Sequence, residues 1–273
     1  MQQLQEDYER LRTSDTEHLR AAIRACRYSG HTAGLAPGLL QANIVILPEA
    51  YALDFMRFCQ RNPKPCPLVG VSETGDPMMR TLGHDIDIRN DVPLYNVYRH
   101  GELHESNTDI NQYWDDSFVA FALGCSFTFE DALVRAGIPI WHIEYNKTVP
   151  MYRSSIQTLP AGPFRGEMVV TMRAIDANRV DEAIEISRRY PMAHGGPVHV
   201  GDPSIIGLND LSQPEWGDSP PPLEDKIPVF WACGVTPQNA IMGAKLPISI
   251  THTPGHMLIT DIDEQAEVPV VTT

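Results

Sequence analysis

Residues 228–261, PVFWACGVTPQNAIMGAKLPISITHTPGHMLITD, contain the pattern that decides the fold. The apolar run 229–232 is typical of a short buried strand, and a sharp turn follows at Cys233-Gly234. Thr236 before Pro237 predicts the start of a helix, with Thr236 as its cap, that runs to about Gly243. Two further apolar runs, 248–250 and 257–259, predict strands, so the stretch has the order of an α/β unit.

Polar and reactive side chains stand where these predicted strands end. Units of this kind place functional groups at the carboxyl ends of their strands. Because the segment is otherwise apolar, these groups are the first candidates for a functional site; they are Cys233, Thr236, Gln238, His252 and His256.

Working outward, the chain predicts two domains. The runs 44–47 and 68–71 flank a predicted helix, and this β–α–β order favours a parallel sheet. In the middle of the chain, 114–123 and 127–134 look helical, and 140–144, 150–154 and 167–173 look like strands. We therefore expect a discontinuous α/β domain, residues 1–110 plus 190–273, with a smaller two-layer α+β domain, residues 111–189, inserted into it.

Composition limits the classes of function. The 273 residues include 21 Lys and Arg against 35 Asp and Glu, a formal charge of −14, which argues against a nucleic-acid partner. No apolar run reaches the roughly 20 residues that cross a bilayer, and the N-terminus lacks the apolar core of a signal peptide. Five cysteines without a C-x-x-C pair predict reduced thiols and a cytoplasmic protein. The sequence leaves a homo-oligomer open.

A glycine-rich turn carries the candidate metal ligands His194, His199 and Asp202. Imidazole and carboxylate are ordinary ligands of divalent metals, but this spacing matches no standard zinc signature. Two other interpretations are open: the histidines bond to the backbone of their loops, or they act as general acids or bases. The sequence requires no cofactor and leaves a divalent metal possible in principle.

Three further side chains have a chemical reading and a structural one. Cys125, before a predicted helix start, would have a lowered pKa and could be a nucleophile, or it belongs to the core. Glu130, close to Phe127 and Phe129, would have a raised pKa suited to a general acid, or it is solvated. Arg153, like Arg173 at a strand end, could grip a carboxylate or be a surface charge.

Several motifs in order resemble the D-glutamate cyclase family, also catalogued as hydro-lyases. They are GCSFTFE at 124–130, VPMYR at 149–153, AGPF at 161–164, HGGPVHVGDP at 194–203, FWACGVTPQ at 230–238 and ITHTPGH at 250–256. The resemblance runs from about Leu35 to Asp261, with conservative departures at Thr128 and Gly196. It implies two α/β domains, a three-layer α/β/α sandwich and a smaller two-layer α+β sandwich. It also implies a lyase acting on a carbon–oxygen bond, and the characterised eukaryotic member converts D-glutamate to 5-oxo-D-proline and water.

Motif position and chemical type then give a hypothesis for the site. Glu130 would be the acid, His199 or His256 the base, and Cys125 the nucleophile of a covalent alternative. Arg153 would anchor a small acidic substrate near the N–H groups of the helix start. The other proposed substrate-binding residues are Gly234, Thr236, Gln238 and His252.

We expect Arg153, His199 and His256 to share one crevice. Two other functions remain open: a hydratase or dehydratase of another small carboxylic acid, and a non-catalytic protein that binds an acidic metabolite.

Overall fold

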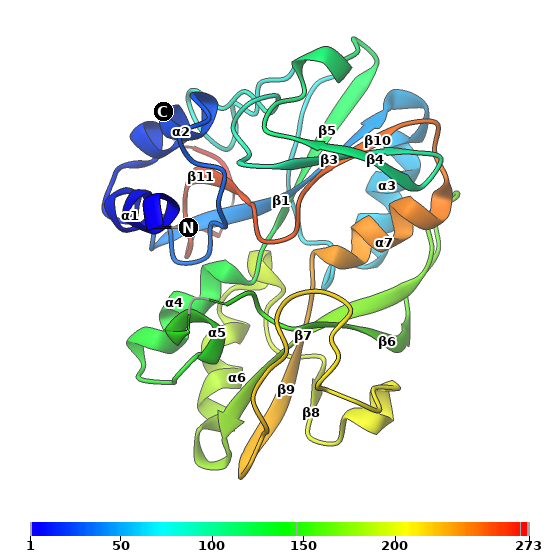
Figure 1. Ribbon diagram of the computed structural model, residues 1–273. Coiled ribbons are helices and arrows are strands. Elements are labelled where there is room, and N and C mark those ends of the chain that lie inside the picture. Colours follow the sequence, from blue (N-terminus) through cyan, green and yellow to red (C-terminus); the bar gives the residue numbers. More distant parts are fainter. Residues whose placement is uncertain (1, 146, 268, 272–273) are drawn as a thin grey trace.

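The computed structural model describes residues 2–145, 147–267 and 269–271, and its strands form two β-sheets, one above the other in Figure 1. The α-helices are α1 (Gln2–Leu11), α2 (Thr16–Arg24), α3 (Glu49–Arg61), α4 (Phe127–Arg135), α5 (Trp141–Glu144), α6 (Val180–Arg188) and α7 (Val235–Ala244). The strands are β1 (Leu39–Pro48), β2 (Leu68–Val71), β3 (Tyr95–Arg99), β4 (Glu102–Asn107), β5 (Phe118–Gly124), β6 (Met151–Gln157), β7 (Glu167–Asp176), β8 (His199–Val200), β9 (Lys226–Ala232), β10 (Ser249–His252) and β11 (Leu258–Asp263).

The larger sheet has seven antiparallel strands in the order β2-β5-β1-β10-β3-β4, with β11 also pairing with β1. Side chains of a strand alternate between its faces, and β1 is buried on both. Val45 and Leu47 pack with Phe58 of α3 and Ile241 of α7. The opposite face packs against the irregular segment 79–92, through Ile44, Ile46, Met79, Leu82, Ile86, Ile88 and Val92.

The smaller sheet has four antiparallel strands in the order β6-β7-β9-β8. Helices α4 and α6 cover one face, where Phe129, Leu133 and Ala183 pack with Val229 and Trp231. The other face lies under the segment after β8, through Ile206 and Leu208 with Tyr152, Val170, Met172 and Phe230. An α/β class with two sheets is thus confirmed.

The segment 228–261 was expected to form a single α/β unit, but its strands belong to two different sheets. β9 belongs to the smaller sheet, α7 packs on the larger one, and β10 pairs within the larger one (Figure 1). The predicted parallel sheet is therefore wrong, because every strand pair in the described chain is antiparallel and β5 lies between β1 and β2.

Two local predictions were also wrong. Residues 114–123 were expected to be helical, but they include most of β5, which is buried on both faces. A strand of that kind is a continuous apolar run that periodicity cannot distinguish from a buried helix. Residues 140–144, expected to be a strand, contain the short helix α5.

The sheets suggest different domain boundaries from those expected. The predicted limits 110/111 and 189/190 separate β5 from β1 and β2, and β9 from β7, although these strands pair. We propose instead that the units meet at the connections after β5 and after β9. Within the described chain, no helix has the length and apolar character to cross a bilayer.

Candidate active site

Two turns of the same form meet where the sheets join. Cys125 follows β5 and leads into α4, and Cys233 follows β9 and leads into α7. Each thiol accepts a backbone hydrogen bond from the residue two positions later, Phe127 N–H for Cys125 and Val235 N–H for Cys233, the latter at 3.4 Å. Both cysteines belong to one apolar cluster, so the fold brings together two strand-end thiols from distant parts of the sequence.

These turns enclose what we call the junction cavity, of about 20 Å³. Its polar lining includes Asn43, Cys125, Ser126, Thr148, Thr171, Cys233 and His252. Such a volume holds about one water molecule. Gly234 allows a close approach here, because a methyl group in its place would collide with the Asn43 amide.

A buried ion cluster stands directly behind this cavity. Arg173 donates from Nη1 to Thr171 Oγ1 at 2.8 Å and from Nη2 to Ser126 Oγ at 3.1 Å. It also donates from Nε to Glu130 Oε1 at 3.1 Å, and His142 Nε2 lies 2.9 Å from the same oxygen. The guanidinium lies over the rings of Phe129 and Trp231, with centroids 5.1 and 5.2 Å away, and the two ring centroids are 5.6 Å from each other.

This arrangement prepares the cavity wall for an anion. Arg173 occupies a lone pair on each of the Ser126 and Thr171 oxygens, which leaves the hydroxyl hydrogens to donate. The Thr171 hydroxyl donates to the Trp231 carbonyl at 3.5 Å, a long bond that an anion in the cavity would replace. A hydroxyl that accepts from a cation becomes a stronger donor in a low-dielectric site. A carboxylate could therefore be held there by two hydroxyls, with the guanidinium behind them.

Glu130 has the opposite ionisation from the one expected. Burial alone would raise its pKa, but the charges of His142 and Arg173 and their hydrogen bonds hold the pKa at about 2. The carboxylate thus stays ionised, and the predicted raised pKa is wrong. Its neighbours make Glu130 the counter-ion of Arg173.

The cysteines also differ from expectation. Burial raises the pKa of Cys125 to about 12 despite the Phe127 N–H, and it raises the pKa of Cys233 to about 11. The predicted lowering for Cys125 is wrong, because loss of solvent outweighs the helix start. Both groups are thiols at neutral pH, which suits proton donors better than nucleophiles.

His252 enters the cavity from β10 as an uncharged imidazole. Burial lowers its pKa to about 4, and the Ile44 N–H donates to its Nδ1 at 3.0 Å. The Gln238 amide lies 3.2 Å from both ring nitrogens, so Gln238 positions the imidazole from behind. Thr236 is not the helix cap that we predicted, because its Oγ1 bonds to both backbone groups of Val169 and joins α7 to β7.

The shared crevice expected for Arg153, His199 and His256 is absent from the described structure. Arg153 is exposed and lies 5.8 Å from the Trp216 ring centroid. His199 lines a hollow that neither of the other two lines, and His256 bonds through Nδ1 to the Pro254 carbonyl at 3.1 Å. The structure therefore brings Cys125, Gly234 and His252 together at the junction cavity, but not these three.

The candidate metal ligands also diverge. His194 is buried, with Nδ1 2.8 Å from the Lys64 carbonyl, and His199 Nε2 lies 2.6 Å from the Asp202 carbonyl. In the described part of the chain, no three His, Cys, Asp or Glu side chains are placed to hold a metal ion. The predicted set His194, His199 and Asp202 is thus not a metal site in this fold.

Sequence reasoning did not select Asn43, Ser126, Thr171 or His142, and it left Arg173 among the alternatives. The sequence did contain one indication of Thr171 and Arg173. Thr171 and Arg173 stand two residues apart in a strand, hence on the same face, within the apolar run of β7. Polar residues that repeat on a buried face need partners, and that need points to an internal polar site.

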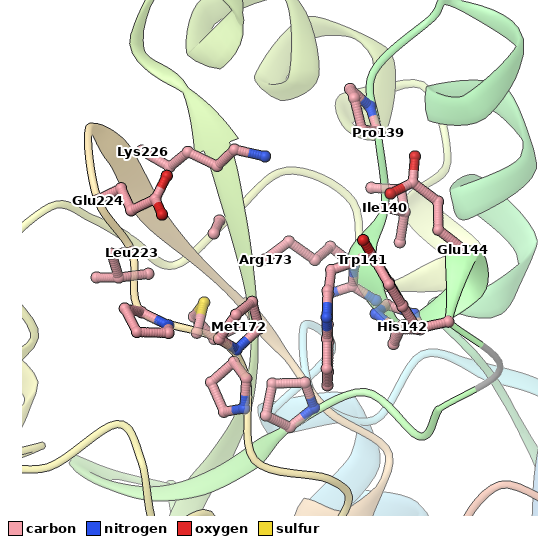
Figure 2. Close-up of a pocket in the computed structure, with 16 residues that line it drawn as sticks. Pro139, Ile140, Trp141, His142, Glu144, Met172, Arg173, Leu223, Glu224 and Lys226 are labelled. Carbon is pink, nitrogen blue, oxygen red and sulfur yellow. The ribbon is translucent and has the colours of Figure 1, made fainter.

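A second, larger hollow lies on the other side of the ion cluster (Figure 2). It measures about 200 Å³ and is bordered by α5, β7 and the segment 220–226; we call it the α5 pocket. His142 and Arg173 form part of its wall, so the cluster separates the α5 pocket from the junction cavity.

We expect acid to destabilise the fold in two pH windows. Burial lowers the pKa of His194 and His252 to about 4 from 6.5, so the unfolded chain binds protons that the folded chain does not. Stability should therefore fall as the pH drops from about 6.5 to 4. The contribution of Glu130 is lost between about 4.5 and 2, because its pKa is lowered in the folded state.

Urea midpoints over this pH range would measure the effect. His194→Asn should flatten the dependence between pH 6.5 and 4, and Asn tolerates the left-handed backbone at this position (φ 73°). His104→Asn, at an exposed position in β4, serves as the control. Equal slopes in all three proteins would contradict the assignment.

Comparison with known proteins identifies the family of this chain. Residues 119–261 match the family model described as D-glutamate cyclase. A protein of Dinoroseobacter shibae named "Putative hydro-lyase" is 65% identical over 97% of this chain and 88% of its own length. Proteins with the same description from Ruegeria pomeroyi and Jannaschia sp. are 64% and 59% identical, covering 97% and 94% of this chain and 97% of each relative.

Proposed function

We propose, from the premise that this chain belongs to the D-glutamate cyclase family, that it is a hydro-lyase that closes D-glutamate to 5-oxo-D-proline with loss of water. The relatives' shared description supports a lyase, and the family model supports this particular substrate. The junction cavity is the proposed catalytic site. The free thiols of the chain also support our proposal that it acts in the cytoplasm.

The reaction sets three requirements. The α-amine attacks the γ-carboxylate carbon, a C–N bond forms, and a C–O bond breaks. Two protons leave the ammonium group and two are needed by the departing oxygen, so the protons balance within the substrate but must be carried across it. A site must therefore hold the α-carboxylate, accept a proton from the ammonium and donate one to the leaving oxygen.

The groups at the junction cavity can meet these requirements. The Ser126 and Thr171 hydroxyls, with Arg173 behind them, would hold the α-carboxylate. The uncharged His252 would accept the proton from the ammonium group. Cys125, a thiol at neutral pH, would donate one proton to the leaving oxygen, and the protonated His252 would supply the other. The resulting Cys125 thiolate would take up the second proton of the amine, with the Cys233 thiol beside it at the opposite turn.

One observation carries this proposal: two thiols, two hydroxyls backed by a buried arginine, and an uncharged imidazole line one cavity. At about 20 Å³ the cavity is too small for D-glutamate, which is far larger than one water molecule. The turns at 124–126, 233–235 and 253–257 must therefore separate to admit the substrate. Closure afterwards would exclude water and favour the reaction that releases it.

Purified protein incubated with D-glutamate provides the test. We expect a product 18 mass units lighter that co-migrates with 5-oxo-D-proline, and no such product from L-glutamate or from protein denatured beforehand. A catalogue of other hydroxy and amino acids, screened for the same loss of water, covers the wider hydro-lyase class. Turnover of one of those compounds, but not of D-glutamate, would refute the specific substrate.

A further inference from the structure

The α5 pocket has the size of a small-molecule site. Its volume, about 200 Å³, is ten times the 20 Å³ of the junction cavity. For scale, an engineered apolar cavity of about 150 Å³ in an unrelated protein binds benzene. The two hollows share no lining residue, so the α5 pocket is separate from the proposed catalytic site.

Apolar groups form most of its wall. Those that line the pocket are Pro139, Ile140, Trp141, Pro150, Met172, Ala174, Pro220, Pro221, Pro222 and Leu223. Figure 2 shows Trp141 facing this space from α5, with Met172 opposite on β7. At the rim, Tyr145 keeps 65% of its surface exposed. Rigid proline and indole surfaces suit an apolar body of a few carbon atoms.

Charges of both signs stand around this apolar wall. Lys226 and Glu224 lie on one side and Glu144 on the other (Figure 2). The Lys226 ammonium is 3.9 Å from Asp176, and the Lys226 side chain is 41% exposed. This long surface pair leaves the ammonium able to bind a second anion. Glu224 has a positive φ of 51°, a conformation that costs energy for a residue other than glycine and is frequent in segments that clamp ligands.

We propose that the α5 pocket binds a free α-amino acid with an apolar side chain. The ligand's carboxylate would pair with Lys226, its ammonium group with Glu224 or Glu144, and its side chain would lie against Trp141 and the prolines. A purely anionic ligand would meet two carboxylates, and a purely apolar one would leave the charges unused. A zwitterion is the small-molecule class that satisfies both signs at once.

Calorimetric titration of the full-length protein tests this with three matched probes. Leucine carries both charges, isovalerate lacks the ammonium group, and isoamylamine lacks the carboxylate. We expect leucine to bind and each truncated probe to bind at least about tenfold more weakly, the factor that 1.4 kcal/mol corresponds to. Equal binding of the three probes would overturn the proposal. So would the absence of binding heat from leucine, methionine and phenylalanine at roughly 10 mM, a concentration above the Kd of a millimolar site.

Variants then locate the site. Lys226→Met should weaken leucine binding by about tenfold or more, whereas Lys245→Met, at an exposed position after α7, should leave it unchanged. An unaltered affinity in Lys226→Met would contradict the assigned contact. Glu224→Gln, tested the same way, should weaken leucine but not isovalerate.

The inference does not depend on the proposed reaction, and the two can fail separately. Leucine binding is measured without turnover, and Cys125→Ala should bind leucine as the unmodified protein does. Saturating D-glutamate should not displace leucine, because the hollows have no wall residue in common. Competition between the two would mean a single shared site and would refute a separate pocket.

Discussion

Arg173→Met should lower the free energy of unfolding by about 3–5 kcal/mol, the usual cost of removing one partner from a buried ion pair. The variant leaves the Glu130 carboxylate fully buried, without the guanidinium and with the His142 imidazole still bonded to it. It also frees the Ser126 and Thr171 hydroxyls from the guanidinium that orients them. Urea denaturation monitored by circular dichroism would measure the loss.

Two further proteins make this prediction specific. Adding Glu130→Gln to Arg173→Met removes the unpaired charge, so the double variant should recover part of the lost stability. Arg188→Met breaks a pair with Glu185 in which both side chains are 63% exposed, and it should change stability by about 1 kcal/mol or less. A double variant less stable than Arg173→Met would show that an unpaired carboxylate is not the cause.

Cys125→Ala should lower kcat for D-glutamate by about 10²–10⁴-fold, the usual contribution of a positioned proton donor. KM should change much less, because the thiol is assigned to the leaving oxygen and not to the α-carboxylate. Initial rates of 5-oxo-D-proline formation at several substrate concentrations separate the two constants.

The matched control is another buried thiol. Cys59 belongs to α3, is 1% exposed and packs in the core with β1 and β5, and it does not line the junction cavity. Cys59→Ala removes the same atoms from a similar environment and should leave kcat unchanged. If Cys125→Ala retained full kcat while remaining folded, the thiol could not be the proton donor.

Part of the fold followed from local sequence. The strands β1, β2, β6, β7 and β9 lie where their apolar runs predicted. The sheet topology did not follow, since β–α–β order is compatible with a parallel neighbour or with strands in different sheets. Pairing of β1 with β5 and β10 is decided by contacts between segments that are distant in the sequence. The hydrophobic periodicity of one segment contains no information about such contacts.

The site was predicted in part for a related reason. Motif resemblance selected Cys125, Gly234 and His252, which do line the junction cavity. The ionisation of Glu130 and Cys125 depends on the charges beside them and on their burial in the folded protein. The sequence pattern around each residue contains neither kind of information. Arg153 and His199 share the motifs but lie elsewhere, so motif membership alone did not identify the cavity wall.

The position of β1 has a consequence for biosynthesis. Its neighbours β10 and β11 come from the end of the chain, some 200 residues after β1 itself. At a translation rate of about 5–20 residues per second, β1 leaves the ribosome roughly 10–40 s before these partners exist. During that interval a long apolar strand has an open edge, which makes the nascent polypeptide a natural client for chaperones.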